Sequence, residues 1–143
     1  MKDPTKPLMI GYNTLLSGIT VSGREVGYYR LQAPYPAKNP MIVLTGFLAL
    51  NDNTRNTFKC DATVDLMIIT SFEGDFGNGE LADDIANEVL QRVIPEPGKS
   101  GVSAAGFTVA SATCRGIKDY QYNRDDRTVY EKRITIEHLI YQI

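Results

Sequence analysis

Hydrophobic and polar side chains alternate most regularly along residues 57–70. The apolar positions of this run are Phe58, Cys60, Ala62, Val64, Leu66 and Ile68. Alternation with a period of two predicts a long strand of an antiparallel sheet, with one face buried and the other half-exposed. The polar face turns apolar at Met67 and Ile69. We therefore expect that end of the strand to be covered by another part of the protein.

Three further segments predict strands. Residues 129–143 form a second long alternating run. Its buried face is predicted to hold Tyr130, Ile134, Ile136, His138 and Ile140. Residues 41–50 are almost continuously apolar, which predicts a strand covered on both faces. Residues 107–117 combine strand-forming and small side chains, which favours close packing against a helix.

Two segments have the spacing of amphipathic helices. The longer one starts at Glu80, after a glycine-rich turn in which Asn78 is the predicted N-cap, and Pro95 ends it. Its apolar face is formed by Leu81, Ile85, Val89 and Val93. The shorter helix has Pro7 in its first turn and reaches about Ser17.

Turn residues separate these elements. Residues 1–7 are predicted to form a flexible arm, and a small hairpin is predicted around Ser22–Gly23, followed by a strand through Val26, Tyr28 and Arg30. The connecting loops are expected at 32–40, 51–57 and 95–106, and residues 118–128 are expected to be a solvated loop or the tip of a hairpin. The order of elements predicts a single α+β domain over residues 1–143, with an antiparallel sheet of long strands and two helices on one face.

Composition narrows the possible functions. The chain has 143 residues, 15 Lys and Arg, 17 Asp and Glu, and a net charge of −2. This balance argues against a cationic nucleic-acid binder, whose affinity depends on phosphate neutralisation. No apolar run is long enough to predict a membrane span. Cys60 and Cys114 have no metal-site spacing and are interpreted as reduced core thiols, although a bridge between them stays open.

Few residues offer catalytic chemistry. His138 is the one histidine, and we interpret it as a half-buried histidine with satisfied hydrogen bonds. Asp61, Asp65 and Glu137 could share one face of the sheet and bind a divalent metal as an acid–base site. The favoured interpretation is a solvated face on which these acids pair with Lys59, Lys132 and Arg133. We therefore predict no enzyme activity, no cofactor and no metal.

Several segments occur together in one known family. They are APYPAKNP before an apolar strand, the glycine-rich turn, the helix ELADDIANEVLQRVI, the segment GFTVAS and the closing strand RTVYEKRITIEHLI. In this layout, from about Leu8 to Ile143, the chain resembles the tail terminator proteins of tailed bacteriophages, also called tail completion or head–tail joining proteins. The chain departs from the usual pattern in its longer loop at 95–106 and in the TVSGREV insertion.

The resemblance implies a structural protein of the virion, assembled in the host cytoplasm. Its copies would form a ring, commonly a hexamer, that caps the tail tube and joins it to the neck. The genome DNA would pass through the lumen without specific binding. Two alternatives stay open: a neck or connector ring of related fold with twelve copies, and a monomeric adaptor module that is not part of a phage.

Loops carried by a rigid sheet are natural docking surfaces. Tyrosine and arginine are over-represented among residues that dominate interface energies. The predicted interface residues are Tyr35, Arg55, Tyr120, Tyr122, Arg124 and Arg127. The alternative for each of them is an ordinary polar side chain on an exposed loop.

Overall fold

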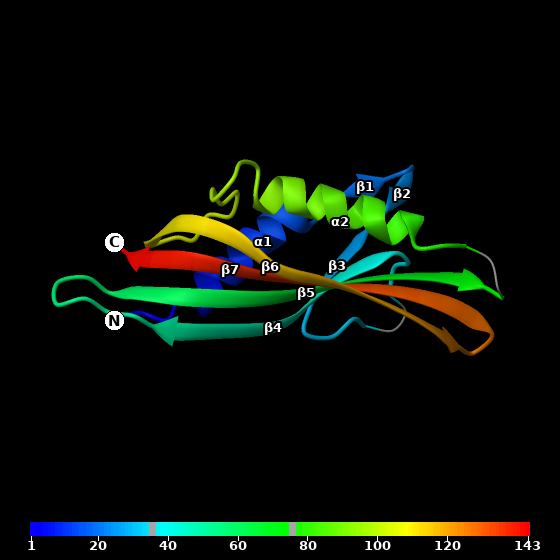
Figure 1. The fold of residues 1–143 in the computed structure, drawn as a ribbon, viewed down its shortest axis with the longest axis horizontal. Coiled ribbons are helices and arrows are strands. Elements are labelled where there is room, and N and C mark those ends of the chain that lie inside the picture. Colours follow the sequence, from blue (N-terminus) through cyan, green and yellow to red (C-terminus); the bar gives the residue numbers. More distant parts are fainter. Residues whose placement is uncertain (35–36, 75–76) are drawn as a thin grey trace.

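The two long alternating segments form the centre of a five-stranded sheet (Figure 1). The computed structural model describes residues 1–34, 37–74 and 77–143. In it, β5 (Lys59–Glu73) pairs antiparallel with β7 (Arg127–Gln142) along its whole length of 15 residues. Both segments thus form the predicted strands, and β5 extends past Ile69, where the alternation of apolar and polar side chains ends.

The other strands flank this central pair in the order β3-β4-β5-β7-β6. The outer long strands, β4 (Met41–Asn51) and β6 (Phe107–Arg124), pair antiparallel with β5 and β7. The short strand β3 (Gly27–Arg30) runs parallel to β4. A separate hairpin is formed by β1 (Thr20–Val21) and β2 (Arg24–Glu25). The α+β class is confirmed, with a sheet that is antiparallel except at β3.

Both helices lie on one face of the sheet (Figure 1), as the sequence predicts. They are α1 (Thr5–Leu16) and α2 (Glu80–Val93). The core between the helices and β5 includes Leu8, Tyr12, Cys60, Ala62, Val64, Leu66, Ile68, Ile85 and Val89. No helix among the described residues is long and apolar enough to cross a membrane. In the described part of the chain, the opposite face of the long strands carries no helix.

The N-terminal segment is shorter than the predicted arm. Helix α1 begins at Thr5, so residues 5–7 are helical, and Pro4 is buried. The backbone N–H of Lys2 donates to the side-chain oxygen of Gln142 at 2.8 Å. The start of the chain is thereby attached to the end of β7.

The cap of α2 lies one residue beyond the predicted position. Gly79 is the N-cap residue, and the side-chain oxygen of Asn78 accepts a hydrogen bond from the N–H of Glu80 at 2.9 Å. Asn78 therefore still satisfies one of the free N–H groups at the helix start.

The prediction that β4 is covered on both faces is wrong for its second half, because Leu48 and Leu50 are 54% and 59% exposed. Of the two forms expected for residues 118–128, the structure has the tip of a hairpin and not a loop, since β6 runs on to Arg124 and pairs with β7. The hairpin turn is only Asp125–Asp126, both with positive φ, as two-residue hairpin turns require. Side chains alternate poorly along 118–124 because most of this edge strand is exposed.

The histidine is fully buried rather than half-buried. His138 on β7 hydrogen-bonds through Nε2 to the Tyr12 hydroxyl of α1, and the two rings meet edge to face. This contact joins the first helix to the last strand. Burial lowers the pKa of His138 to about 4 and raises the pKa of Tyr12.

The buried histidine predicts a loss of stability in mild acid. In the unfolded chain His138 takes up a proton below about pH 6.5, whereas in the folded chain it stays neutral until about pH 4. Stability is therefore complete above pH 6.5 and falls as the pH drops toward 4. We expect the free energy of unfolding to be about 2 kcal/mol lower at pH 5 than at pH 7.5 from this group.

Urea unfolding at the two pH values measures this difference, and NMR titration of the single imidazole measures its pKa directly. The variant His138→Gln should lose the corresponding part of the pH dependence. An imidazole that titrates near 6.5 in the folded protein would contradict the prediction.

Candidate assembly surface

The three carboxylates considered as an alternative metal or acid–base site do not come together. The strand register places Asp61, Asp65 and Glu137 on the helix-free face, but each has its own surroundings. Glu137 binds Arg115 through two hydrogen bonds of 2.9 and 3.0 Å, which lowers the pKa of Glu137 and raises that of Arg115. Asp65 accepts a hydrogen bond from the Thr135 hydroxyl at 2.8 Å. Within residues 1–34, 37–74 and 77–143, no group of three His, Cys, Asp or Glu side chains could hold a metal ion.

The lysines and arginine expected to neutralise these acids have other partners. Lys59 pairs with Asp52, and Arg133 pairs with Glu131. Lys132 is buried on the helix side, where its Nζ lies 2.8 Å from a carboxylate oxygen of both Asp83 and Asp119. Burial by itself lowers the pKa of Lys132, but the hydrogen bonds that its ammonium group donates to Asp119 and Asp83 raise the pKa overall. Lys132 thus connects α2 to β6.

Both cysteines are free thiols. Cys60 is buried in the core under the helices, and burial raises the pKa of its thiol. Cys114 lies half-buried on β6. Cys60 is thus in the core as predicted, whereas Cys114 only packs against its rim.

The predicted interface residues separate into two groups. Tyr35 lies outside the described residues. Arg55 is exposed in the loop between β4 and β5, at the opposite end of the sheet from the β6–β7 turn (Figure 1). The other four residues share the β6–β7 hairpin: Tyr120, Tyr122, Arg124 and Arg127.

The two tyrosines of the hairpin lie on the helix-free face. The register pairs Tyr120 with Glu131 and Tyr122 with Val129, both on that face. The Tyr120 ring has two cations beside it, with Arg133 at 4.7 Å and Lys118 at 5.2 Å from the ring centroid. These contacts form a surface that is both aromatic and basic.

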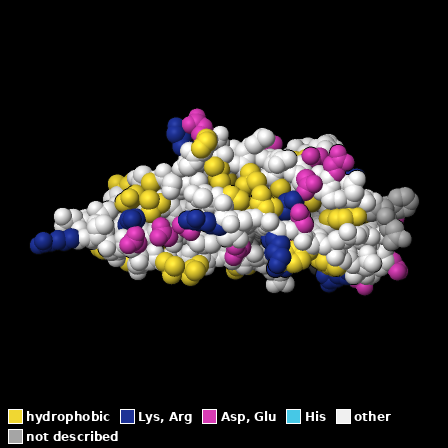
Figure 2. All heavy atoms as spheres, in the orientation of Figure 1, with side chains coloured by type: hydrophobic (Ala, Val, Ile, Leu, Met, Phe, Trp, Pro, Cys, Tyr) yellow, Lys and Arg dark blue, Asp and Glu magenta, His cyan; other side chains and the backbone are white. Residues whose placement is uncertain are grey.

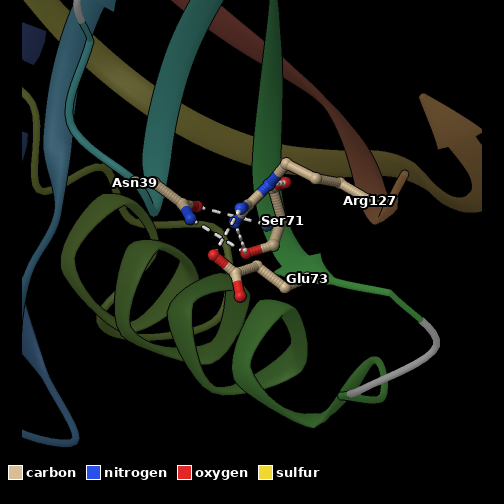
Figure 3. Close-up of polar contacts among 4 residues, drawn as sticks. All are labelled: Asn39, Ser71, Glu73 and Arg127. Carbon is tan, nitrogen blue, oxygen red and sulfur yellow. Dashed lines mark hydrogen bonds and ion pairs between the residues drawn. The ribbon is translucent and has the colours of Figure 1, made fainter. Parts of the chain in front are cut away.

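The two arginines beside the turn have different surroundings. The guanidinium of Arg127 donates to the hydroxyl and the carbonyl oxygen of Ser71, at 2.6 and 3.1 Å, and lies 3.8 Å from Glu73 (Figure 3). Ser71 also exchanges two hydrogen bonds with the side chain of Asn39. Arg124 is exposed, and among the described residues its one charged contact is with its neighbour Asp125, at 3.9 Å. Arg127 therefore stabilises the chain itself, whereas the Arg124 side chain is exposed beside the hairpin turn.

Four apolar side chains are exposed along the outer strands of the sheet, and sequence reasoning missed three of them. Within the described part of the five-stranded sheet, the large apolar side chains classed as exposed are Leu48 and Leu50 on β4, and Ile117 and Tyr122 on β6. Of these, only Tyr122 was predicted as an interface residue. The absence of any charged residue from 45–51 is the signal that could have found the β4 edge, since exposed edge strands are usually protected by charges.

The comparisons with known proteins reveal a shared fold. No family model matches the chain, and no curated protein matches it. Among solved structures, a chain in the "Virion of native gene transfer agent (GTA) particle" is similar, with a TM-score of 0.70 and 11% sequence identity. The similarity covers 96% of this chain and 98% of that chain. At such low identity the likeness establishes the α+β fold, and it extends over nearly the whole of both chains.

The contrast between the two arginines gives a matched pair of variants. We expect Arg127→Ala to lower the free energy of unfolding by about 1–2 kcal/mol, because it leaves the polar groups of Ser71 without their charged donor. Arg124→Ala should change it by less than about 0.5 kcal/mol. Urea unfolding of both variants checks the prediction, and equal effects of the two substitutions would contradict it.

Proposed function

We propose that this chain is a structural protein of a phage-like virion and acts as a tail terminator. Copies of the chain form a ring at the head–tail junction, cap the tail tube and join it to the neck. The observation that carries the proposal is the similarity of fold to a virion chain over 96% of this chain and 98% of the other. The likeness of the sequence layout to tail terminators supports the same position in the particle.

The architecture suits a component that assembles rather than one that turns over a substrate. Two carboxylates of the helix-free face have separate partners, since Glu137 binds Arg115 and Asp65 accepts a hydrogen bond from Thr135. The apolar side chains exposed on the sheet lie on the edge strand β6 and on the second half of β4, which β3 does not cover. Two different edges on one protomer permit head-to-tail contacts, and such contacts close into a ring when the rotation between copies is suitable.

The charge pattern is compatible with a ring through which DNA passes. The chain has a net charge of −2, and acidic and basic side chains are interspersed over the side visible in Figure 2. A protein with a net negative charge gains little from counterion release and binds DNA weakly. DNA is therefore a passing occupant of the lumen, while the specific partners are the tail tube and the neck.

The runner-up is a neck or connector ring of related fold. The same fold and the same free edges would serve a ring of six or of twelve copies. Particle composition and copy number separate these forms, and a monomeric adaptor would form neither ring.

The proposal predicts a defined assembly of the purified chain. We expect the native mass to rise with concentration to a closed ring of six copies, visible by negative-stain microscopy, or the protein to form that ring on the ends of isolated tail tubes. A ring of twelve copies would favour the connector alternative. A protein that stays monomeric at every concentration and does not bind tube ends would contradict the proposal.

A further inference from the structure

Two segments of strand edge are left without partners in the described chain. Strand β4 is paired with β3 only as far as Leu44, whose carbonyl also accepts a hydrogen bond from the N–H of Leu31. Beyond Leu44, no described backbone group bonds to the outer side of residues 45–51. We call this segment the β4 edge.

The second free segment belongs to β6, at the other side of the sheet. The start of β6 is covered by the preceding loop, because the N–H of Ala112 donates to the carbonyl oxygen of Gly98 at 3.4 Å and Ala104 bridges to Phe107. From residue 113 to residue 124, no described backbone group bonds to its outer side. We call this segment the β6 edge.

The β4 edge lacks the features that protect sheet edges from pairing. Residues 45–51 read TGFLALN and contain no charged residue and no proline. Leu48 and Leu50 are exposed on the helix-free face. A long, uncharged, apolar edge of this kind is a template for another strand. The β6 edge exposes two apolar side chains on opposite faces of the sheet, Tyr122 on the helix-free face and Ile117 on the helix side.

We propose that the β6 edge of one copy pairs with the β4 edge of the next copy, so that one continuous sheet runs through the ring. The proposal rests on the proposed function, and it specifies how neighbouring copies make contact. The partner is a second copy of this chain because each protomer offers both edges, on opposite sides of one sheet. Pairing them satisfies the free backbone groups of both edges at once.

The direction of the strands agrees with this contact. Within one copy, β4, β5, β7 and β6 alternate in direction, so β6 runs opposite to β4. If the ring axis is roughly parallel to the strands, rotation about this axis from one copy to the next does not reverse the direction of a strand. The β6 edge therefore meets the next β4 edge antiparallel, as the other pairs of long strands do.

The register follows from the stagger that a closed sheet needs. Strands in closed sheets tilt by about 35–45°, and four strands spaced by about 4.8 Å span about 19 Å. The next copy is then displaced along the strand by about four to six residues. Within one copy, Gly46 and Gly116 lie at the same height in the sheet, because Gly46 pairs with Asp65, Asp65 with Thr135 and Thr135 with Gly116. If the next copy is displaced toward the β6–β7 turn, its β4 edge lies beside the free part of β6.

A displacement by an even number of residues keeps each side chain on its own face of the continuous sheet. A shift of four residues places Leu48 opposite Lys118 of the neighbouring copy, and a shift of six places it opposite Tyr120. Leu50 then lies opposite Gly116 or Lys118. The carboxylate of Asp61, beside Leu50 in the sheet, comes near the cation of Lys118 across the contact, so that opposite charges meet.

Disulfide cross-linking tests the contact in a Cys114→Ser background, in which Cys60 is buried. The variants carry Lys118→Cys together with either Leu48→Cys or Leu50→Cys. We expect oxidation to give a ladder of covalent oligomers up to the full ring, with Leu48→Cys more efficient for a shift of four and Leu50→Cys for a shift of six. The matched control combines Leu48→Cys with Thr108→Cys. Thr108 lies on β6 and on the same face as Lys118, but beside the covered part of the β6 edge, so this variant should give no ladder.

A charge substitution tests the contact without cysteines. Leu48→Lys should raise the concentration for half-assembly by at least about tenfold, whereas Thr63→Lys, at the same level on the central strand β5, should leave assembly unchanged. Circular dichroism establishes that both variants fold. If the Leu48→Lys variant still forms rings and the cysteine variants give no ladder, this contact is wrong and the proposed function stays intact. A wild-type chain that forms no ring in solution or on tube ends overturns both.

Discussion

The fold depends on the burial of one face of two central strands. Every second residue of β5 from Cys60 to Ile68 is at most 5% exposed beneath the helices, and the residues between them are more exposed. A slip of one residue would place Asp61 and Asp65 in the core and Val64 and Leu66 in water. The pairing of β5 with β7 is therefore fixed by the sequence, and it also fixes which face is left without a helix.

The same arrangement determines where the molecule can make contacts. Two helices cover one face of the central strands, so the other face and the outer edges stay accessible. The chain covers only part of each edge itself, through Leu31 on β4 and Gly98 on β6. The uncovered parts hold the apolar side chains exposed on the sheet. Assembly through these edges removes them from water without any change in the protomer.

Helices and strands with strong periodicity could be predicted from the sequence, whereas the burial and the contacts of individual side chains could not. Helix α2 and strands β5 and β7 follow from spacing alone, because one face of each is buried. The coverage of β4 was mispredicted because an apolar edge strand and a buried strand have the same composition. Arg124 and Arg127 stand in one charged stretch, and only the fold separates the exposed guanidinium from the one bound to Ser71. Tyr12 and His138 are 126 positions apart, so no local pattern could predict their contact.

Cryo-electron microscopy of the head–tail junction, in a particle that carries this chain, would locate the chain directly. We expect a single closed ring of copies between the last ring of the tail tube and the neck, with neighbouring copies joined through their sheets. Density for the chain in the capsid shell or at the tail tip, or its absence from the purified particle, would contradict a role as tail terminator.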